Sequence, residues 1–428
     1  MRNDPRSHGL WKRSAPPAPP TVALTDELTV DVAVIGAGFT GLSAALHLAE
    51  AGRGVAVLEA EEIGFGGSGR NVGLVNAGMW VMPDDLPAAL GETHGERLLA
   101  MLGDAPRAVF ELVEKHAIPC EIERQGTLHC AVGEKGLREL TERARQWQAR
   151  GAPVELLDAA ETARKVGTSA YAGALLDRRA GTIQPLAYAR GLAKAAIAAG
   201  ARIFTASPVA VARQENGLWR LETEGGGAVK ARHVVLATDA YASRIWTEIR
   251  REQVHLPYFN MATPPLGDNL RRSILPERQG VWDTEEILSS FRFDQAGRLV
   301  FGSVGALRGS GRPIHRNWGR RALARLFPQL AGIRFEMEWY GKIGMTENSL
   351  PRFHQPARNV YGFSGYNGRG IAPGTVFGQT LARLVQGELA VEDLPLPATA
   401  AVPARYRVAR EAYYEIGAQL AHAAGARF

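Results

Sequence analysis

Three closely spaced glycines are the residues whose chemistry follows most directly from the sequence. Gly36, Gly38 and Gly41 follow an apolar run at 29–35 and precede helical apolar spacing over 40–51. The first glycine permits a tight turn, the second lets the backbone approach a pyrophosphate, and the third allows the helix to pack closely on the strand. Free N–H groups at the start of such a helix suit phosphate groups. The pattern predicts a dinucleotide-binding turn.

A carboxylate completes this pattern. Gly52 and Gly54 end the helix, a second apolar strand is expected at 55–58, and Glu59 follows it, 18 residues after Gly41. A carboxylate at this place accepts hydrogen bonds from ribose hydroxyls, which favours an adenosine ribose without a 2′-phosphate. Strand, turn, helix and second strand form a complete βαβ unit. We therefore expect a bound dinucleotide rather than a helix-packing pattern without a ligand.

A second glycine-rich segment, at 63–80, favours FAD over NAD. Its sequence is IGFGGSGRNVGLVNAGMW, with six glycines. A backbone this free of side chains can lie against a flat ring system.

Five motifs in a specific order then resemble a known family. They are GSGRNVG at Gly67, GTIQP at Gly181, ATDAYA at Ala237, WYGKIGMTENSLP at Trp339 and GFSGYNGRGIAPG at Gly362. Together they resemble the amine-oxidising flavoproteins of the D-amino-acid oxidase superfamily. That group includes glycine oxidase, sarcosine oxidase, γ-glutamylputrescine oxidase and enzymes like iminodiacetate oxidase. The segments 85–160 and 250–335 match only loosely.

The resemblance implies a set of residues that bind FAD. The ADP half would lie on Gly36, Gly38, Phe39, Thr40, Gly41, Glu59 and Ala60, with Val209, Ala237 and Thr238 beside it. The flavin side would be lined by Ser68, Arg70, Asn71, Gly73 and Leu74, and closed by Gly365, Gly368, Arg369, Gly370 and Ile371. Some sarcosine oxidases attach FAD through a cysteine in the segment that matches WYGKIGMT, and Gly341 stands at that place. Non-covalent FAD is the expectation.

The resemblance also implies the chemistry. A hydride leaves the carbon next to nitrogen for flavin N5, water hydrolyses the resulting imine, and oxygen is reduced to H2O2. Because the cofactor performs the difficult step, no catalytic triad is expected. The residues predicted to act on substrate are Arg369, Lys342, Tyr258 and Arg292. Arg369 would grip a carboxylate or form an ion pair with the flavin or within the protein, and Arg292 with Arg298 would either add a second cation or lie solvated at the surface. Lys342 would favour oxygen reduction near the flavin.

Other side chains are weaker candidates for the substrate site. Trp80 and Asn260 would border it, although aromatic residues most often belong to the core. His255 is expected to be a structural histidine rather than a base.

Several functions stay open at this point. The first is oxidation of a small secondary amine or N-substituted amino acid carrying carboxylates, such as sarcosine or iminodiacetate. The alternative within the family is γ-glutamylputrescine or a related polyamine derivative, because GFGGSGRN resembles that subgroup most closely. Three further hypotheses belong to other functional classes. They are a dehydrogenase that passes electrons to a quinone or protein partner, a flavin-stabilised binding protein without turnover, and a tRNA-modifying relative.

The order of expected elements predicts an α/β fold of two interleaved domains. Residues 28–84, 161–249 and 336–428 would form a discontinuous, Rossmann-like FAD-binding domain. Residues 85–160 and 250–335 would form an inserted α+β substrate domain with an antiparallel sheet, including helices near 95–116 and 134–149 and a hairpin at 294–297. The Pro-rich residues 1–27, with APPAPP at 15–20, predict an extended and poorly packed arm.

Composition excludes other classes. The chain has 428 residues, 46% of them hydrophobic and 22% charged, which is typical of globular proteins. Two cysteines and scattered histidines predict no disulfide scaffold and no metal site, so Cys120 and Cys130 are expected to be buried thiols. A net charge of +6 without a dense Lys/Arg stripe favours small anionic ligands over nucleic acid. With no leader and no apolar run of about 18 residues, we expect a cytoplasmic protein away from membranes.

Overall fold

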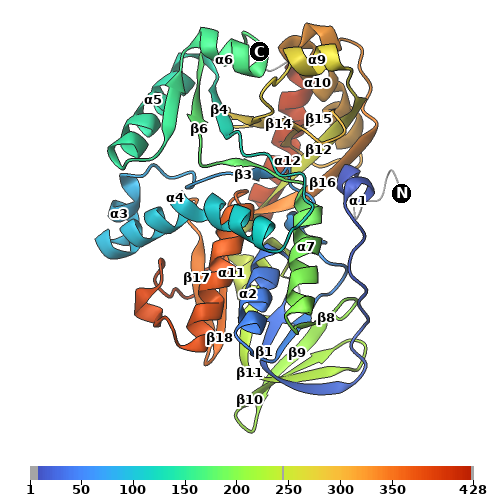
Figure 1. Cartoon of the computed structure of the whole chain (residues 1–428), viewed down its shortest axis with the longest axis vertical. Coiled ribbons are helices and arrows are strands. Elements are labelled where there is room, and N and C mark those ends of the chain that lie inside the picture. The colour runs from blue at the N-terminus through green and yellow to red at the C-terminus, as the bar shows by residue number, and fades with distance from the viewer. Residues whose placement is uncertain (1–7, 243–244, 426–428) are drawn as a thin grey trace.

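Two large sheets dominate the computed structural model, which describes residues 8–242 and 245–425. Figure 1 shows the first sheet in the lower part of the molecule and the second in the upper part, with helices α2, α4, α7 and α11 near the middle. The expected α/β class, with a Rossmann-like domain and a second domain, is confirmed.

The first sheet has a parallel core. Its strand order is β17-β18-β11-β1-β2-β8, and the hairpin of β9 and β10 pairs with β11. The bounds are β1 (Glu27–Ile35), β2 (Val55–Leu58), β8 (Arg202–Phe204), β9 (Val209–Glu215), β10 (Leu218–Thr223), β11 (Ala228–Leu236), β17 (Arg352–Ala357) and β18 (Val360–Ser364). Helices α2 (Phe39–Glu50), α7 (Pro185–Ala198) and α11 (Ile371–Gln386) pack together beside it. Parallel strands buried on both faces are apolar throughout, as in β2.

The second sheet is mainly antiparallel, in the order β16-β12-β15-β14-β13-β4-β6-β5. The bounds are β4 (Thr127–Ala131), β5 (Val154–Leu157), β6 (Gly173–Asp177), β12 (Val254–Pro265), β13 (Gly280–Asp283), β14 (Ser289–Phe293), β15 (Arg298–Val304) and β16 (Met337–Met345). A small sheet joins β3 (Leu74–Val75) to β7 (Gly181–Thr182). The predicted hairpin at 294–297 joins β14 to β15.

The remaining helices pack mainly on α11, on one another and on the second sheet. They are α1 (Leu10–Ser14), α3 (Asp85–Leu90), α4 (Glu92–Lys115), α5 (Gly133–Ala149), α6 (Ala159–Val166), α8 (Thr247–Arg251), α9 (Asp268–Ser273), α10 (Gly311–Leu326) and α12 (Arg407–Ala424). Short 3-10 turns lie at Gly67–Gly69, Asp239–Tyr241, Pro328–Leu330 and Val391–Asp393. The helices expected near 95–116 and 134–149 are therefore present as α4 and α5.

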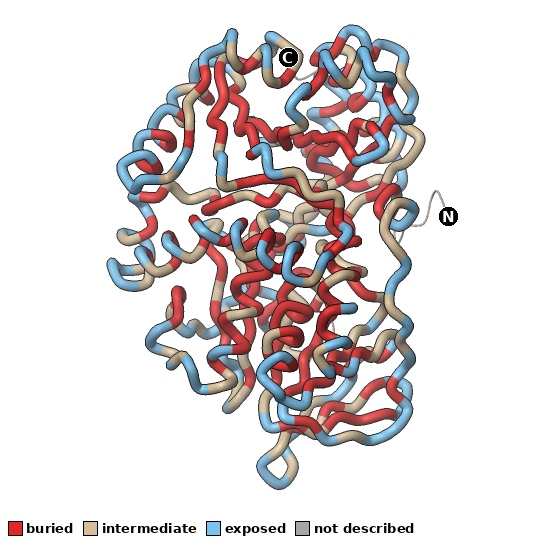
Figure 2. The backbone as a smooth tube through the Cα atoms, in the orientation of Figure 1, coloured by how far each residue is buried: buried red, intermediate tan, exposed pale blue. Residues whose placement is uncertain are grey.

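Sheet membership bears on the domain boundaries. β6 and β16 fall in the segments 161–249 and 336–428, which were assigned to the FAD-binding domain, yet both lie in the second sheet. The division of the chain into domains stays a prediction, and these strands favour boundaries a little later in the chain. Figure 2 shows buried backbone running through both halves of the molecule and across their junction.

The N-terminal arm differs from the expectation. Leu10 and Trp11 are fully buried, and α1 packs into a small core with Leu186, Val300 and Trp339. The prediction of a poorly packed arm is wrong for the described part that carries these two side chains, because an apolar pair anchors the chain despite the prolines beside it. Residues 1–7 of the arm lie outside the described residues.

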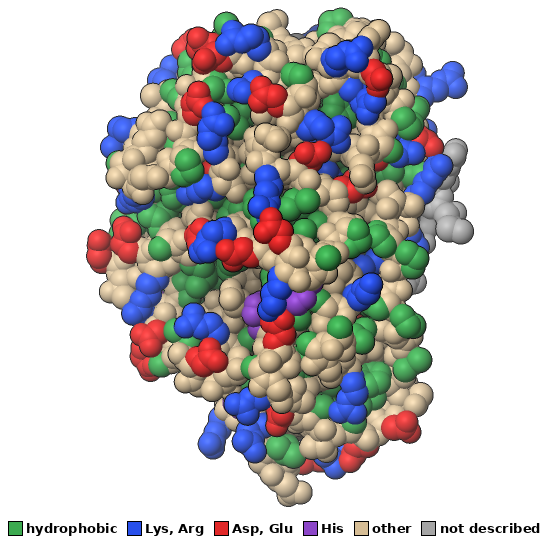
Figure 3. Space-filling view, in the orientation of Figure 1, with side chains coloured by type: hydrophobic (Ala, Val, Ile, Leu, Met, Phe, Trp, Pro, Cys, Tyr) green, Lys and Arg blue, Asp and Glu red, His purple; other side chains and the backbone are tan. Residues whose placement is uncertain are grey.

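The two thiols follow the expectation. Cys120 and Cys130 are free and buried. Figure 3 shows acidic and basic side chains interspersed on the face in view. Within the described residues, no group of His, Cys, Asp and Glu is arranged to hold a metal ion. None of the helices described is long and apolar enough to cross a membrane.

Buried histidines predict that the fold loses stability in acid. Burial lowers the pKa of His315 and of His354 from 6.5 to about 4. The unfolded chain therefore takes up these protons near pH 6.5, whereas the folded chain does not until about pH 4. The free energy of unfolding should fall as pH drops through that window, by at most about 1.4 kcal/mol per pH unit for each histidine. Thermal denaturation across this range measures the effect, and a flat profile would contradict it.

Candidate active site

One large cavity lies where the two sheets meet. Its volume is about 670 Å³, and residues from both sheets and from the glycine-rich segment line it. Its lining includes Glu59, Val209 and Ile249 as well as Trp80, Trp282 and Arg369. The carboxyl ends of β1 and β2, the N-termini of α2 and α11 and the strand β16 all reach this cavity. A space of this volume is large enough for a cofactor-sized ligand.

The glycine turn has the close contacts that its spacing predicts. A Cβ atom at Gly41 would lie 2.0 Å from the carbonyl oxygen of Gly36, so only glycine lets α2 approach β1 this closely. Gly36 has a φ of 105°, which favours glycine. Gly38 caps α2 and lines the cavity. The helix N-terminus therefore presents its partial positive charge to this part of the cavity.

Glu59 lies at the end of β2 and faces the cavity. Its carboxylate accepts hydrogen bonds from the backbone N–H of Ala37 at 2.7 Å and of Glu61 at 2.9 Å. Burial raises the pKa of Glu59, although the backbone N–H groups act in the opposite direction. A buried carboxylate with remaining acceptor capacity is suited to bind hydroxyl donors.

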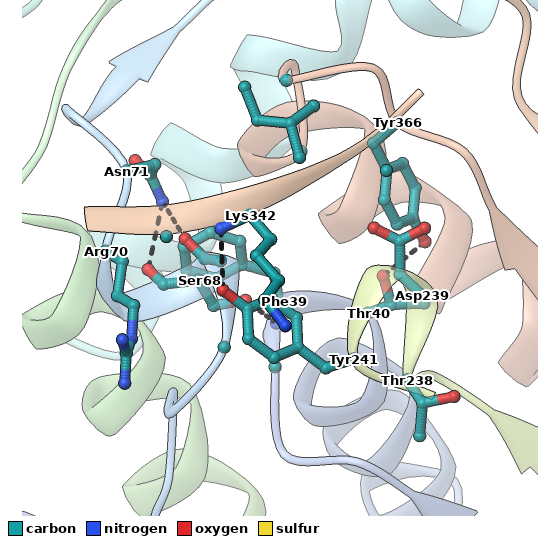
Figure 4. A pocket seen from close by; sticks show the side chains of 18 of the residues that line it. Phe39, Thr40, Ser68, Arg70, Asn71, Thr238, Asp239, Tyr241, Lys342 and Tyr366 are labelled. Atoms are coloured by element: carbon teal, nitrogen blue, oxygen red, sulfur yellow. Dashed lines mark hydrogen bonds between the residues drawn. The ribbon is translucent and has the colours of Figure 1, made fainter. Parts of the chain in front are cut away.

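The loop after β2 folds back over the glycine turn. The Ser68 hydroxyl accepts from the N–H of Phe39 at 3.1 Å, and the Asn71 side chain donates to the carbonyls of Gly67 and Ser68 at 2.9 and 3.1 Å. The Asn71 side-chain oxygen also accepts from Gly73 N–H at 2.8 Å. Figure 4 shows this loop beside Tyr241 and Lys342, whose backbone N–H donates to the Tyr241 hydroxyl at 3.0 Å.

Side chains from distant parts of the chain hold three consecutive carbonyls of this loop. The Arg70 carbonyl accepts from Asn260 and from Trp339, at 3.0 Å in each case. The Asn71 carbonyl accepts from the indole N–H of Trp11 at 2.8 Å. The Val72 carbonyl accepts from Arg292 Nε at 2.8 Å. The N-terminal arm and the second sheet thus fix the position of the loop.

The N-terminus of α11 closes the cavity from another side. The hydroxyls of Thr40 and Tyr366 are 2.7 Å apart and join α2 to the segment before α11 (Figure 4). Asp239 accepts from the N–H of Gly365 at 2.8 Å and from Gln253 at 3.2 Å. Burial raises the pKa of Asp239, although these donors act in the opposite direction.

Arg369 lies against two indole rings that pack edge-to-face with each other. Its guanidinium carbon is 4.7 Å from the ring centre of Trp80 and 4.6 Å from that of Trp282, and Nη1 donates to the Ala77 carbonyl at 3.2 Å. Burial lowers the pKa of Arg369 to about 9, and the nearby positive charge of Arg143 also lowers it. The cation is therefore held by aromatic faces rather than by a carboxylate of the described chain.

The wall opposite the loop is aromatic and polar. The hydroxyls of Tyr258 and Ser290 are 2.7 Å apart, and both residues line the cavity. Glu285 and Glu286, which follow β13, line it as well. Lys342 lines it from β16, and burial together with Arg250, Arg308 and Arg70 lowers the pKa of this lysine, whereas Glu411 raises it. Positive and negative side chains thus both reach the space.

Most residues predicted from the sequence meet at this cavity. Its lining includes Gly36, Gly38, Phe39, Thr40, Glu59, Ala60, Ser68, Arg70, Asn71, Leu74, Val209, Ala237, Thr238, Tyr258, Lys342, Gly368, Arg369, Gly370 and Ile371. Three predicted glycines lie just behind it, namely Gly41, Gly73 and Gly365. They permit close backbone contacts: at Gly73, for example, a Cβ atom would lie 2.1 Å from the Ile183 carbonyl oxygen.

Arg292 and Arg298 do not supply the second cation that was expected. Arg292 is 1% exposed, and besides Val72 it donates to the carbonyls of Ile183 and Phe293. Arg298 pairs with Asp294 at 3.2 Å and with Glu336 at 3.5 Å, away from the cavity lining. Both predictions are wrong because the hairpin directs these side chains to neighbouring backbone and acids.

The structure also shows where the three weaker candidates lie. Trp80 lines the cavity, whereas Asn260 is fully buried behind the loop it holds. His255 is nearly buried and lies 2.8 Å from Arg250, outside the lining, in the structural position expected for it.

Sequence reasoning missed further residues that line the cavity, among them Trp282, Glu285, Glu286 and Tyr366. Trp282, Glu285 and Glu286 lie in a segment where the family motifs match only loosely, so no local pattern marks them. Tyr366 lies inside the quoted motif at 362–374, and its position between two glycines was an available indication.

Comparisons with known proteins agree with this geometry. Residues 31–384 match the family described as FAD dependent oxidoreductase. The gamma-glutamylputrescine oxidoreductase of Escherichia coli (strain K12) is 34% identical over 374 residues, which cover 86% of each chain. A probable oxidoreductase OrdL of Haemophilus influenzae is 32% identical and 92% of each chain is covered.

A solved structure shows the same fold. The glycine oxidase from Geobacillus kaustophilus has a TM-score of 0.70 at 23% identity, with 87% of this chain and 99% of that chain covered. The family match spans more than half of the chain, and relatives named gamma-glutamylputrescine oxidoreductase and glycine oxidase are among its matches. The protein therefore belongs to the family of FAD-dependent oxidoreductases that contains the amine and amino-acid oxidases, as the five motifs implied.

Proposed function

We propose that this protein oxidises an N-substituted amino acid with one carboxylate beside the reacting carbon, of the sarcosine type, with FAD bound non-covalently in the large cavity. The observation that carries the proposal is Arg369, a buried cation that lines the substrate end of the cavity with no carboxylate of the described chain as its hydrogen-bond or ion-pair partner. A substrate carboxylate would supply the missing negative charge.

The residues of the cavity fit FAD. Glu59 would accept from the ribose, the N-terminus of α2 would face the pyrophosphate, and the loop at 67–72 would lie along the flavin. When bound, FAD accepts a hydride from the carbon beside the substrate nitrogen. Neither Cys120 nor Cys130 lines the cavity, and Gly341 does, which supports binding without a covalent bond.

Arg369 would orient the substrate for that step. Trp80 and Trp282 pack edge-to-face with ring centres 5.2 Å apart, and the guanidinium lies against both rings, so that its remaining edge would bind a carboxylate with two parallel hydrogen bonds. A carboxylate fixed in this way fixes the adjacent C–H bond. The two indoles and Tyr258 would also exclude water from the reacting atoms.

The cavity favours one carboxylate over two. A dicarboxylate such as iminodiacetate needs a second cation beside Arg369; neither Arg292 nor Arg298 lines the cavity, and Arg70 and Lys342 are the lining cations left to supply it. Glu285 and Glu286 also lie in the lining and would repel a second negative group. The two glutamates therefore favour a sarcosine-like substrate over an iminodiacetate-like one.

A second candidate is an elongated amine such as γ-glutamylputrescine. Glu285 and Glu286 would attract a positively charged group at one end of the cavity. The relative from Escherichia coli that is 34% identical carries the name of this substrate. In this case Arg369 would bind a carboxylate at the other end of the molecule.

Flavin reduction by a panel of amines tests these alternatives. The yellow holoenzyme is mixed anaerobically with sarcosine, iminodiacetate, glycine, D-alanine, proline and γ-glutamylputrescine, and air is then admitted. We expect sarcosine or a related N-alkyl amino acid to bleach the flavin, and air to restore the colour as an oxidase requires. Bleaching by γ-glutamylputrescine alone would select the second candidate. Bleaching without recovery in air would instead indicate a dehydrogenase with another electron acceptor.

Replacing Arg369 tests its contact with the carboxylate. Arg369→Met keeps an unbranched side chain between the indoles but removes the charge. The substrate Kd from flavin spectral titration should rise by about 10- to 100-fold, because a charge-assisted hydrogen bond contributes about 1.5–3 kcal/mol. An N-methylated amine without a carboxylate is the matched control ligand and should lose no affinity. Equal losses for both ligands would mean that Arg369 is structural.

Replacing Trp11 tests whether the N-terminal arm supports the cofactor loop. Trp11→Phe keeps an aromatic ring but leaves the Asn71 carbonyl without its donor. We expect FAD binding to weaken by about 5-fold, since one hydrogen bond contributes about 1 kcal/mol. Flavin fluorescence during titration of the apoprotein measures the Kd. Arg13→Ala, which removes a surface ion pair of the same arm, is the control. An unchanged Kd with a lower melting temperature would contradict the prediction.

A further inference from the structure

Trp282, one of the two indoles against which Arg369 lies, is stacked on a buried histidine. Trp282 lies in β13 and His129 in the neighbouring parallel strand β4, where the two are register partners. Register partners place their side chains on the same face of a sheet. The two rings are accordingly stacked, with their centres 3.3 Å apart and their planes 13° apart. Trp282 therefore contacts both the guanidinium of Arg369 and the ring of His129.

The two indoles beside Arg369 are held in different ways. Trp80 Nε1 donates to the Asn367 carbonyl at 2.6 Å, and the Trp80 carbonyl accepts from Arg143 at 2.8 Å. Within the residues that the structure describes, the indole N–H of Trp282 makes no hydrogen bond. Hydrogen bonds thus fix the orientation of Trp80, whereas the orientation of Trp282 depends on the rings packed against it.

A small cavity beside this stack gives Trp282 room to move. Its volume is about 30 Å³, and its lining includes His129, Arg143, Asp177, Trp282 and Arg369. Trp282 and Arg369 line the large cavity as well, so both side chains border on two spaces. Side chains keep one orientation where their neighbours fill the space around them. Loss of the His129 ring would therefore leave Trp282, and with it Arg369, free to shift.

His129 is suited to this place because its ring is flat and stays uncharged. Burial lowers the pKa of His129 well below its usual value, and the positive charges of Arg143 and Arg369 lower it further. Its Nδ1 atom is buried and has no hydrogen-bond partner among the described residues. A neutral ring offers a face to the indole without adding a third positive charge beside the two arginines.

We propose that His129 is a positioning residue for substrate binding, which keeps Trp282 in the orientation that directs the free edge of Arg369 toward the carboxylate. The inference rests on the proposed function, because it concerns the arginine that would bind the substrate. His129 is not part of the lining of the large cavity, so it acts on the substrate only through Trp282 and Arg369.

Binding of methoxyacetate to the holoenzyme tests this role. In this ligand an ether oxygen replaces the nitrogen of sarcosine, so that the carboxylate is kept while the reacting amine is absent. The change in flavin absorbance gives the Kd. His129→Leu removes the flat face and should raise the Kd about 5-fold, the effect expected for the loss of one aromatic pair. His129→Phe restores a flat, uncharged ring and should keep the Kd within about 2-fold of the wild type.

A control and a double variant separate positioning from stability. His233→Leu removes a histidine that stacks on Tyr361 in the first sheet and should leave the Kd unchanged. Arg369→Met should raise the Kd by itself, and adding His129→Leu should then have no further effect, because His129 acts through Arg369. Flavin absorbance and melting temperature verify that each variant folds, and His129→Asn, which also lacks the ring, replaces the leucine variant if that one does not fold.

The outcomes distinguish this inference from the function on which it rests. A wild-type Kd in His129→Leu, an equal loss in His129→Phe, or a further loss in the double variant would overturn the role of His129 and leave the proposed function intact. No binding of methoxyacetate to the wild type, or an unchanged Kd in Arg369→Met, would instead count against the proposed function, and the role of His129 would fall with it.

Discussion

The shape of the cavity depends on hydrogen bonds to three consecutive peptide carbonyls. The carbonyl groups of residues 70, 71 and 72 accept hydrogen bonds from side chains of the second sheet and of the N-terminal arm. Unbonded carbonyls in such a buried loop would each cost about 1–3 kcal/mol. The loop that would lie along the flavin is therefore fixed by parts of the chain that belong to neither the glycine turn nor its helix. This makes Arg292 and Trp11 important for the site although neither lines the cavity.

A second constraint joins the loop to the glycine turn. Because no side chain separates α2 from β1 at Gly41, the helix N-terminus comes close enough for the N–H of Phe39 to meet the Ser68 hydroxyl. The same helix packs on α11, where Thr40 meets Tyr366. One close helix–strand approach thus determines where the nucleotide end, the loop and the α11 N-terminus stand relative to one another.

Most of the fold and of the cavity lining could be predicted from local sequence patterns. The other features depend on pairing between distant parts of the chain. The βαβ unit, the hairpin at 294–297 and the residues of the glycine-rich loop follow from spacing along the chain. The direction of Arg292 does not, because the face to which a strand residue points depends on its register with distant strands. The position of Trp11 could not be predicted either. Its side chain packs between α7 and the second sheet, and the composition of a Pro-rich arm does not reveal that contact. Trp282, Glu285 and Glu286 lie where the chain departs from family motifs.

The surroundings of Arg369 explain why an arginine suits this position. A lysine ammonium holds its hydration shell strongly, so burial against two indoles would drive it toward the neutral form. A guanidinium is flat, weakly hydrated and attracted to both aromatic faces, and it keeps N–H groups at its edge for a carboxylate. Burial still lowers its pKa, and the negative charge of Asp177 acts in the opposite direction. In the proposed function, a substrate carboxylate beside Arg369 would lower the cost of burying this charge, whereas a neutral or cationic group would not. The charge of the site would then favour one class of ligand independently of its shape.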